Sequence, residues 1–155
     1  MKSDVRDLRR GTSLAGTRWP ASKGRSAMLA GSRVLVVEDE ALIAMGISAM
    51  LTDAEAVPVG PAASVREARQ LIRDVAVLDA AVLDVNLADG SVTPILEALS
   101  ARGIPTVIYT GGVVPEDVRH RHPNLVALSK PVLPARLIGE LRKAIGPARP
   151  HRSWG

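Results

Sequence analysis

Residues 80–90 have the sequence AAVLDVNLADG, and the interpretation of the whole chain starts from this stretch. The four small or branched apolar residues Ala80–Leu83 are typical of a short strand that is buried on both faces. An acid, Asp84, follows this strand directly, and the pair Asp89-Gly90 is typical of a turn. A buried strand that ends in a carboxylate indicates a polar site at the edge of a sheet, provided that other strands end beside it.

Four further segments have the length and apolar character of strands. They are residues 33–37, 56–59, 105–109 and 125–128. Pro58 cannot donate a hydrogen bond to a strand ladder, so the second strand in the chain is expected at an edge of the sheet. Segments with helical period separate the strands, which predicts right-handed βαβ crossovers and a parallel sheet.

The helices between these strands are predicted from apolar residues at helical spacing. One helix opens at Ser64, because Ser64 and Glu67 have the spacing of a capping box, and a short helix is expected at 115–119. The last helix has Pro134 in its first turn and ends at Gly146. The inward-facing residues predicted for the helices are Ile43, Ile47, Met50, Leu51, Val65, Ala68, Ile72, Val92, Ile95, Leu96, Leu99, Leu137, Leu141 and Ile145.

The composition predicts a core of aliphatic side chains. The 155 residues are 46% hydrophobic, with one Tyr, two Trp and no Phe. The absence of Cys excludes disulfides and thiolate metal sites. No apolar run reaches the roughly 18 residues of a membrane span, and the first 27 residues lack the apolar region of a secretory signal. A cytoplasmic location is therefore expected.

Charge divides the chain into three parts. Residues 1–31 carry +5 and residues 147–155 carry +2, whereas residues 32–146 carry −3. We therefore predict a flexible basic leader over 1–31, one domain over 32–146 and a short C-terminal tail over 147–155. Met28, just before the first strand, is a candidate translation start. A basic leader can contact nucleic acid or anionic lipid, although a solvated leader is the favoured interpretation.

Polar side chains of complementary chemistry follow four of the predicted strands. Glu38 and Asp39 follow the first strand, Asp84 follows the third, Thr110 the fourth and Lys130 the fifth. In open α/β sheets, sites assemble at this carboxyl edge. Three clustered carboxylates repel one another unless a cation joins them, and ligand sets made only of oxygen suit Mg²⁺.

These residue types together indicate phosphoryl transfer. Asp84 is a candidate nucleophile for phosphorus, while Mg²⁺, the Lys130 ammonium and the Thr110 hydroxyl would stabilise the transferring group. Each residue alone has a simpler explanation: Asp39 or Glu40 could cap a helix, and a lone Lys before Pro is usually a solvated turn residue. Their recurrence at four strand ends favours the site over these separate explanations.

Four motifs now carry a resemblance to a known family. VLVVEDE (34–40), AVLDVNLADG (81–90), VIYTGG (107–112) and LSKP (128–131) resemble, in order and spacing, the motifs of two-component response regulator receiver domains. The resemblance covers about residues 32–146. It implies a flavodoxin-like fold, a doubly wound five-stranded parallel sheet of order 2-1-3-4-5 with helices on both faces. The segments EDEALIAM and GPAASVREA also resemble receivers of alphaproteobacterial stress signalling.

The resemblance implies a Mg²⁺ site and a role for each of its residues. Asp84 matches the phosphoacceptor and Asp39 the direct Mg²⁺ ligand. Glu38 matches the acidic partner of Asp39, which usually acts through water. Asn86 matches the position whose backbone carbonyl completes the metal site. The acidic pair is Glu-Asp where Asp-Asp is common in the family, a variant that affects metal affinity.

The resemblance also assigns the residues that respond to the phosphoryl group, with two departures. Thr110 matches the switch hydroxyl and Lys130 the phosphate-pairing lysine. Ala127 occupies the position where the family usually has Tyr or Phe, which leaves the usual Thr–aromatic coupling in doubt. Gly111 and Gly112 stand where larger residues are frequent, so we expect them to leave the phosphoryl group open and the following loop pliable.

The implied function is that of a stand-alone response regulator. It would take a phosphoryl group from a sensor histidine kinase or a histidine phosphotransfer protein and act on a downstream protein target. The nine residues after Gly146 are too few for a DNA-binding helix pair, so the output is expected through protein contacts. No enzymatic activity is expected beyond the domain's own phosphorylation and dephosphorylation. The roles of phosphate sink, phosphorelay intermediate and adaptor stay open.

Two alternatives come from other classes of protein. One is a small aspartyl-phosphate phosphatase of the haloacid-dehalogenase type, which needs Asp-x-Asp near the start of the chain, whereas this chain has Asp84-Val85-Asn86 on the third strand. The other is nucleic-acid binding through the basic leader, which steep salt dependence would reveal.

Overall fold

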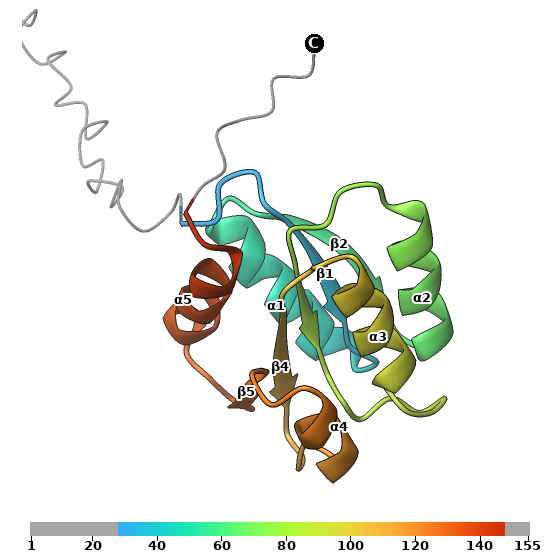
Figure 1. The fold of residues 1–155 in the computed structure, drawn as a ribbon. Coiled ribbons are helices and arrows are strands. Elements are labelled where there is room, and N and C mark those ends of the chain that lie inside the picture. Colours follow the sequence, from blue (N-terminus) through green and yellow to red (C-terminus); the bar gives the residue numbers. More distant parts are fainter. Residues whose placement is uncertain (1–27, 148–155) are drawn as a thin grey trace, which may run out of the picture.

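The computed structural model describes residues 28–147, which form one α/β unit (Figure 1). Its five strands make a single parallel sheet of order β2-β1-β3-β4-β5. This order confirms the predicted doubly wound sheet and the edge position of the strand that contains Pro58. In chain order the elements are β1 (Arg33–Val37), α1 (Ala41–Asp53), β2 (Val57–Ala62), α2 (Val65–Asp74), β3 (Ala80–Leu83), α3 (Thr93–Ala101), β4 (Thr106–Thr110), α4 (Glu116–Arg121), β5 (Val126–Ser129) and α5 (Pro134–Ile145).

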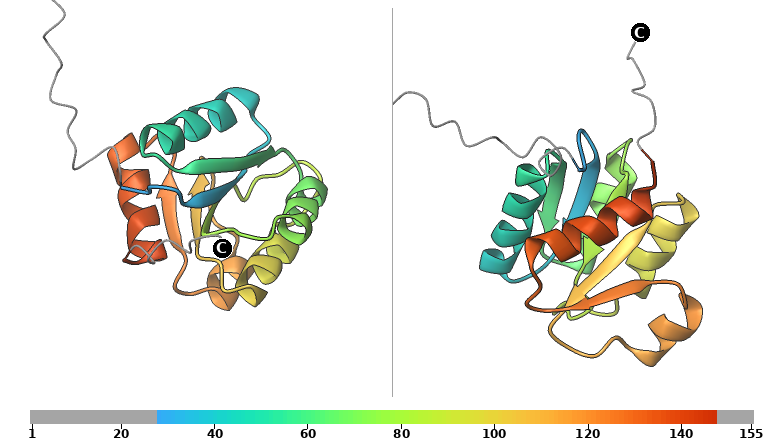
Figure 2. Two further views of the ribbon diagram at one scale, coloured as in Figure 1. Left: turned by 90° about the horizontal axis from the view of Figure 1, so that it is seen from above. Right: turned by 90° about the vertical axis from the view of Figure 1, so that its left-hand side faces the viewer.

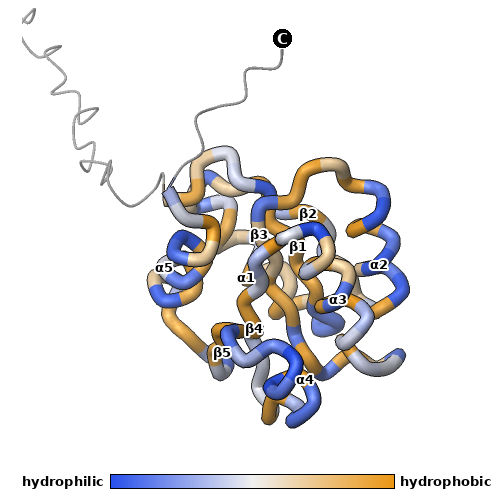
Figure 3. Tube along the Cα trace, viewed as in Figure 1, coloured by the Kyte–Doolittle hydropathy of each residue, from blue (hydrophilic) through white to orange (hydrophobic). Residues whose placement is uncertain are grey.

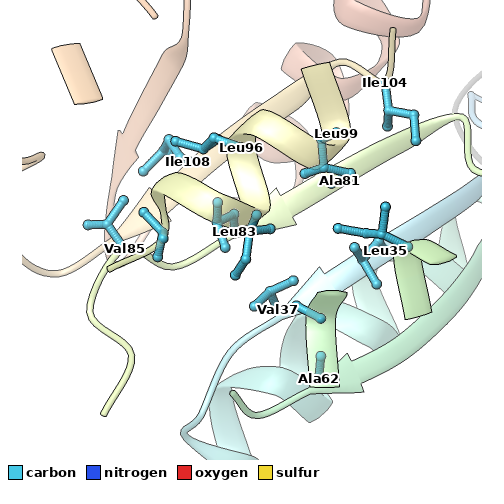
Figure 4. Packing of buried hydrophobic residues seen from close by; sticks show 14 of the residues in the cluster. Leu35, Val37, Ala62, Ala81, Leu83, Val85, Leu96, Leu99, Ile104 and Ile108 are labelled. Atoms are coloured by element: carbon cyan, nitrogen blue, oxygen red, sulfur yellow. The ribbon is translucent and has the colours of Figure 1, made fainter. Parts of the chain in front are cut away.

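The central strands are apolar throughout because helices cover both faces of the sheet. Leu35 and Val37 of β1 pack in a cluster with Leu96 and Leu99 of α3 (Figure 4), and the cluster also includes residues of α2 and α4. Val34 and Val36 pack in a second cluster with α1 and α5. Figure 2 shows the helices on the two sides of the sheet, and Figure 3 shows hydrophobic strands between partly hydrophilic helices. The inward-facing residues predicted for the helices are all buried or packed partly buried against these clusters.

The start of α2 combines a predicted cap with one that the sequence did not reveal. The Ser64 hydroxyl accepts a hydrogen bond from the Glu67 N–H (3.1 Å), as the capping-box spacing predicts. Asp89, from the loop after β3, accepts hydrogen bonds from the N–H groups of Val65 (2.8 Å) and Arg66 (3.3 Å). These side chains satisfy the first N–H groups of the helix and tie α2 to the loop that follows β3.

Several predicted boundaries are wrong by a few residues. β2 continues to Ala62 rather than residue 59, because the pairing with β1 resumes after a register shift, with Val37 opposite Ala62. Gly60 makes the shift feasible: its φ is +96°, and a Cβ there would lie 2.8 Å from the Ala62 nitrogen. β4 and β5 each begin and end one residue later than predicted, which makes Thr110 the last residue of β4. The short helix α4 likewise runs to Arg121.

The packed part of the chain begins before residue 32. Leu29 is only 2% exposed, its N–H donates to the Ala54 carbonyl (3.1 Å), and the Gly31 N–H donates to the Glu55 carbonyl (2.9 Å). Residues 28–31 therefore belong with the domain rather than with the leader. The leader and tail predicted for residues 1–27 and 148–155 lie outside the described residues. Within 28–147 no helix has the length and apolar character needed to cross a membrane.

Candidate functional site

The parallel register brings the ends of four strands to one edge of the sheet. Val37 pairs with Leu83, and Thr110 pairs with Ser129. The ladder continues past the strands, because the Asp84 N–H donates to the Val37 carbonyl (3.0 Å) and the Lys130 N–H to the Thr110 carbonyl (2.9 Å). Backbone pairing thus fixes the positions of the residues at the ends of β1, β3, β4 and β5, from which the side chains of the site extend.

Asp84 lies at the centre of this edge and is 4% exposed. Its Oδ1 accepts hydrogen bonds from the Thr110 hydroxyl (2.9 Å) and the Asn86 N–H (2.9 Å), while its Oδ2 lies 2.8 Å from Lys130 Nζ. Burial pushes the pKa of Asp84 upward, but Lys130, Asn86 and Thr110 outweigh it and hold that pKa below its ordinary value. The Asp84 carboxylate is therefore ionised and held at both oxygens.

Lys130 joins this carboxylate to a second one. Its Nζ lies 2.7 Å from Oε2 of Glu38, which is 1% exposed. Burial raises the pKa of Glu38, whereas the contacts with Asp84 and Glu38 outweigh burial of Lys130 and raise the pKa of its ammonium. The ammonium also lies 5.7 Å from the centroid of the Tyr109 ring, a cation–π contact that sequence reasoning missed. One cation therefore serves two buried carboxylates.

The three acids found in the sequence do come together. Glu38, Asp39 and Asp84 each offer a carboxylate oxygen, and these oxygens all lie within 4.8 Å of one another. Asp39 is exposed, so the cluster opens to solvent on its side. Carboxylate oxygens at this spacing are the donors that a hard divalent cation prefers, and the open side leaves room for further oxygen ligands. The residues present therefore fit a divalent metal.

The Asn86 side chain has a contact that the sequence did not predict. Its amide Nδ2 donates to Thr110 Oγ1 (3.1 Å), and the Gly112 N–H donates to the same oxygen (3.2 Å). A Cβ at Gly112 would lie 2.5 Å from Asn86 Nδ2 and would displace the amide. The glycine pair was expected to leave the site open, but at Gly112 it makes room for a side chain that lies against the Thr110 hydroxyl.

Comparisons with known proteins identify the family. No protein-family model matches the sequence, and no curated protein matches it. Among solved structures, SdrG from Pseudomonas melonis Fr1, in a BeF3-activated conformation, is 38% identical with a TM-score of 0.62, and the match covers 76% of this chain and 98% of that one. A CheY-like response regulator receiver domain protein from Methanospirillum hungatei JF-1 has a TM-score of 0.66 at 23% identity, over 75% of this chain and 94% of that one. This chain belongs to the response regulator receiver domains.

The receiver is also similar to part of a longer regulator. PhyR from Brucella abortus is 27% identical with a TM-score of 0.65, and the match covers 79% of this receiver but 51% of PhyR. The receiver family, rather than the haloacid-dehalogenase family, is the one that these similarities show. The positions of the acids, Thr110 and Lys130 agree with this family, because they lie at the strand ends where the resemblance placed them.

Ala127 stands where the family resemblance leads one to expect Tyr or Phe, and the structure shows its surroundings. Ala127 pairs with Ile108 across β4 and β5, and its side chain is exposed. The Tyr109 ring lies in the opposite core cluster, with α1 and α5. No aromatic ring of the described residues therefore lies on β5, and a ring movement on that strand is excluded for this part of the chain.

Proposed function

We propose that this receiver accepts a phosphoryl group on Asp84, with Mg²⁺, from a sensor histidine kinase or a histidine phosphotransfer protein in the cytoplasm. The observation that carries the proposal is the convergence of three donors on one ionised carboxylate: the Thr110 hydroxyl, the Asn86 N–H and the Lys130 ammonium. A carboxylate held only for structure would not need to lie at an opening beside two further acids.

The proposed reaction is a direct transfer between two side chains. A carboxylate oxygen of Asp84 forms a bond to the phosphorus of a phosphohistidine, and the P–N bond to the donor breaks. The donor imidazole leaves with the electron pair of that bond and takes up a proton, while Asp84 becomes an acyl phosphate. The lowered pKa of Asp84 supports this role, because the attacking group must be ionised.

The metal would be held by the acidic cluster. Glu38, Asp39 and Asp84 supply carboxylate oxygens, and the backbone carbonyl of Asn86 is the further ligand that the family resemblance assigns. When bound, Mg²⁺ supplies positive charge to the phosphoryl oxygens. Lys130 adds a second positive charge from the protein, and Thr110 has a hydroxyl in place to donate a hydrogen bond to one phosphoryl oxygen.

The surface beside the site suggests where the phosphodonor docks. Leu42 and Met45 lie three residues apart in the first turns of α1, just after Asp39, and are 83% and 66% exposed. Large apolar side chains exposed together are typical of a protein contact. A donor that packs on them would have its phosphohistidine near Asp84. The output is proposed to pass through protein contacts as well, with no turnover of other substrates.

Mass spectrometry of the intact protein tests the proposal. Incubation with acetyl phosphate and Mg²⁺ should add one phosphoryl group to the wild type and none in the presence of EDTA. Asp84→Asn should abolish the gain, whereas Asp89→Asn, which keeps an oxygen to cap α2, should retain it. A full gain in Asp84→Asn would show that the acceptor lies elsewhere.

A further inference from the structure

Three charged side chains of the acidic site extend from one face of the sheet, the face that packs against α1 and α5. Side chains alternate between the two faces along a strand, so residues two positions apart share a face. Val36, Val82 and Leu128 belong to the core cluster on the α1–α5 face. The residues two positions further along the chain are Glu38, Asp84 and Lys130. The two acids and the lysine that joins them therefore extend from the same face.

Tyr109 belongs to this face as well and lies beside the lysine. It pairs with Leu128, two residues before Lys130, and its ring packs in the same core cluster. Tyr109 is 5% exposed, and Lys130 Nζ lies over its ring, 5.7 Å from the centroid. Thr110, the next residue along β4, extends from the opposite face and donates to the other oxygen of Asp84. The Asp84 carboxylate thus lies between a hydroxyl from one face and an ammonium–ring pair from the other.

The ring gives the ammonium a partner that carries no negative charge. An aromatic face attracts a cation that lies within about 6 Å of the ring centroid, and the attraction is stronger where water is excluded. The Lys130 side chain is only 13% exposed, so most water is excluded from this contact. An aliphatic side chain in place of Tyr109 would fill much of the same space without attracting the ammonium.

The other two partners of the ammonium are acids that the proposed reaction also uses. Glu38 and Asp84 lie in the acidic cluster that fits a divalent metal, and Asp84 is the proposed phosphoacceptor. Their attraction for Lys130 weakens when their charge is shared with a metal or when Asp84 becomes an acyl phosphate. The contact between Lys130 and Tyr109 does not depend on either carboxylate, so it is retained under both conditions.

We propose that Tyr109 is a positioning residue for Lys130, and that its ring keeps the ammonium directed at Asp84 while the phosphoryl group is transferred. The inference rests on the proposed phosphorylation of Asp84 and adds a residue to the groups that serve it. The aromatic ring of Tyr109, rather than its hydroxyl or the volume that it fills, is the feature that the reaction requires.

The position of the ammonium can be tested without metal or phosphodonor. Protons that lie over the face of an aromatic ring give signals shifted upfield. In the full-length, ¹³C-labelled protein in EDTA, the ε-methylene signals of Lys130 should be shifted upfield in the wild type and in Tyr109→Phe, and should return to ordinary values in Tyr109→Leu. Val107→Ala, which removes core volume from the same face of β4, is the matched control and should leave these signals unchanged.

The rate of phosphorylation tests what the ring contributes to the reaction. With acetyl phosphate and Mg²⁺, at a temperature where circular dichroism shows each variant folded, Tyr109→Leu should slow the mass gain about threefold, as expected for the loss of one cation–π contact. Tyr109→Phe and Val107→Ala should react at close to the wild-type rate. In a Lys130→Met background, Tyr109→Leu should cause no further slowing, because the ammonium is already absent.

Three outcomes would overturn the inference. They are Lys130 signals without an upfield shift in the wild type, equal rates in the wild type and Tyr109→Leu, and equal slowing by Tyr109→Leu with and without Lys130. If Lys130→Met does not fold, the signals of Lys130 and the single-variant rates still decide the question. A wild type that gains no phosphoryl group would instead refute the proposed function, and the signals of Lys130 would still show whether Tyr109 holds the ammonium.

Discussion

The carboxyl-edge site and the α4–β5 region lie on the same sheet but differ in how firmly they are held. Both oxygens of Asp84 are bonded, and all four residues of β3 beside it are buried. In β5 only Leu128 is buried, and in the six residues of α4 only Val118 is. The α4–β5 region also holds a hollow beside Val118 and Ala127, and an unpaired buried imidazole nitrogen, that of His122.

The difference follows from position in the sheet. β1 and β3 are central strands that helices cover on both faces, whereas β5 is an edge strand. Central strands can therefore hold charged groups in fixed positions, and the edge can rearrange at small cost. For the proposed function, fixed positions at the central strands suit a site that must hold a phosphoryl group. Easy rearrangement at the edge strand suits a surface that changes when the site is phosphorylated.

The largest effect on the free energy of unfolding is expected when one cationic side chain is removed from each region and the two losses are compared. Lys130→Met leaves Glu38 and Asp84 buried without their counter-ion, so it should lower the free energy of unfolding by about 3 kcal/mol in EDTA. Arg119→Met on α4 should change it by no more than about 0.5 kcal/mol. Chemical denaturation of both variants measures the difference, and equal losses would remove the proposed contrast.

The same substitution should have opposite signs in the two regions. Ala81→Leu on β3 overfills a closed core and should destabilise the protein by about 1–3 kcal/mol. Ala127→Leu on β5 has the hollow beside it and should stabilise the protein by about 0.5–2 kcal/mol. Thermal unfolding with the wild type as reference gives both values. A destabilising Ala127→Leu would mean that the hollow does not accept a side chain.

Mg²⁺ affinity tests the acidic cluster at its exposed member, Asp39. Asp39→Ala removes one of the three clustered carboxylates and should weaken Mg²⁺ binding at least about tenfold, or roughly 1.4 kcal/mol. Asp53→Ala, an exposed acid at the other end of α1, is the control and should leave the affinity unchanged. Calorimetric titration distinguishes the two, and an unchanged affinity in Asp39→Ala would exclude Asp39 as a ligand.

The smallest expected change is in local exchange rates. Beryllofluoride, a phosphate mimic, should alter amide hydrogen exchange over residues 110–122 more than over β5, because Ala127 has no ring to move and the Gly111-Gly112 turn is pliable. The rest of the sheet should stay protected in both states. Changes confined to β5 and α5, with residues 110–122 silent, would contradict this part of the account.

Much of the fold and site could be predicted because the signals are local. A buried strand, a capping box or an acid at a strand end occupies a few consecutive residues, as at Ala80–Leu83, Ser64 and Asp84. Parallel topology then places the strand ends together without further information. The parallel sheet and the position of the acidic cluster were predictable for this reason, whereas the order of the strands came from the family resemblance.

The features that escaped prediction depend on segments that meet only after folding. Asp89 caps a helix that starts 24 residues earlier, and Asn86 reaches the Thr110 hydroxyl because Gly112 has no side chain. Arg102 donates to the carbonyls of Val75 (3.0 Å) and Ala76 (2.8 Å) at the end of α2, again from another element. Nothing in the local sequence distinguishes these residues from ordinary turn or surface positions.

Residue-level mapping of the phosphoryl group tests the central claim most directly. After incubation with acetyl phosphate and Mg²⁺, the protein is digested and the modified peptide is sequenced by mass spectrometry, with hydride reduction to mark the acyl phosphate. The account predicts one modified residue, Asp84, because this carboxylate lies at the centre of the carboxyl edge, has donors on both oxygens and has a pKa held below its ordinary value. A phosphoryl group found instead on Glu38 or Asp39 would contradict it.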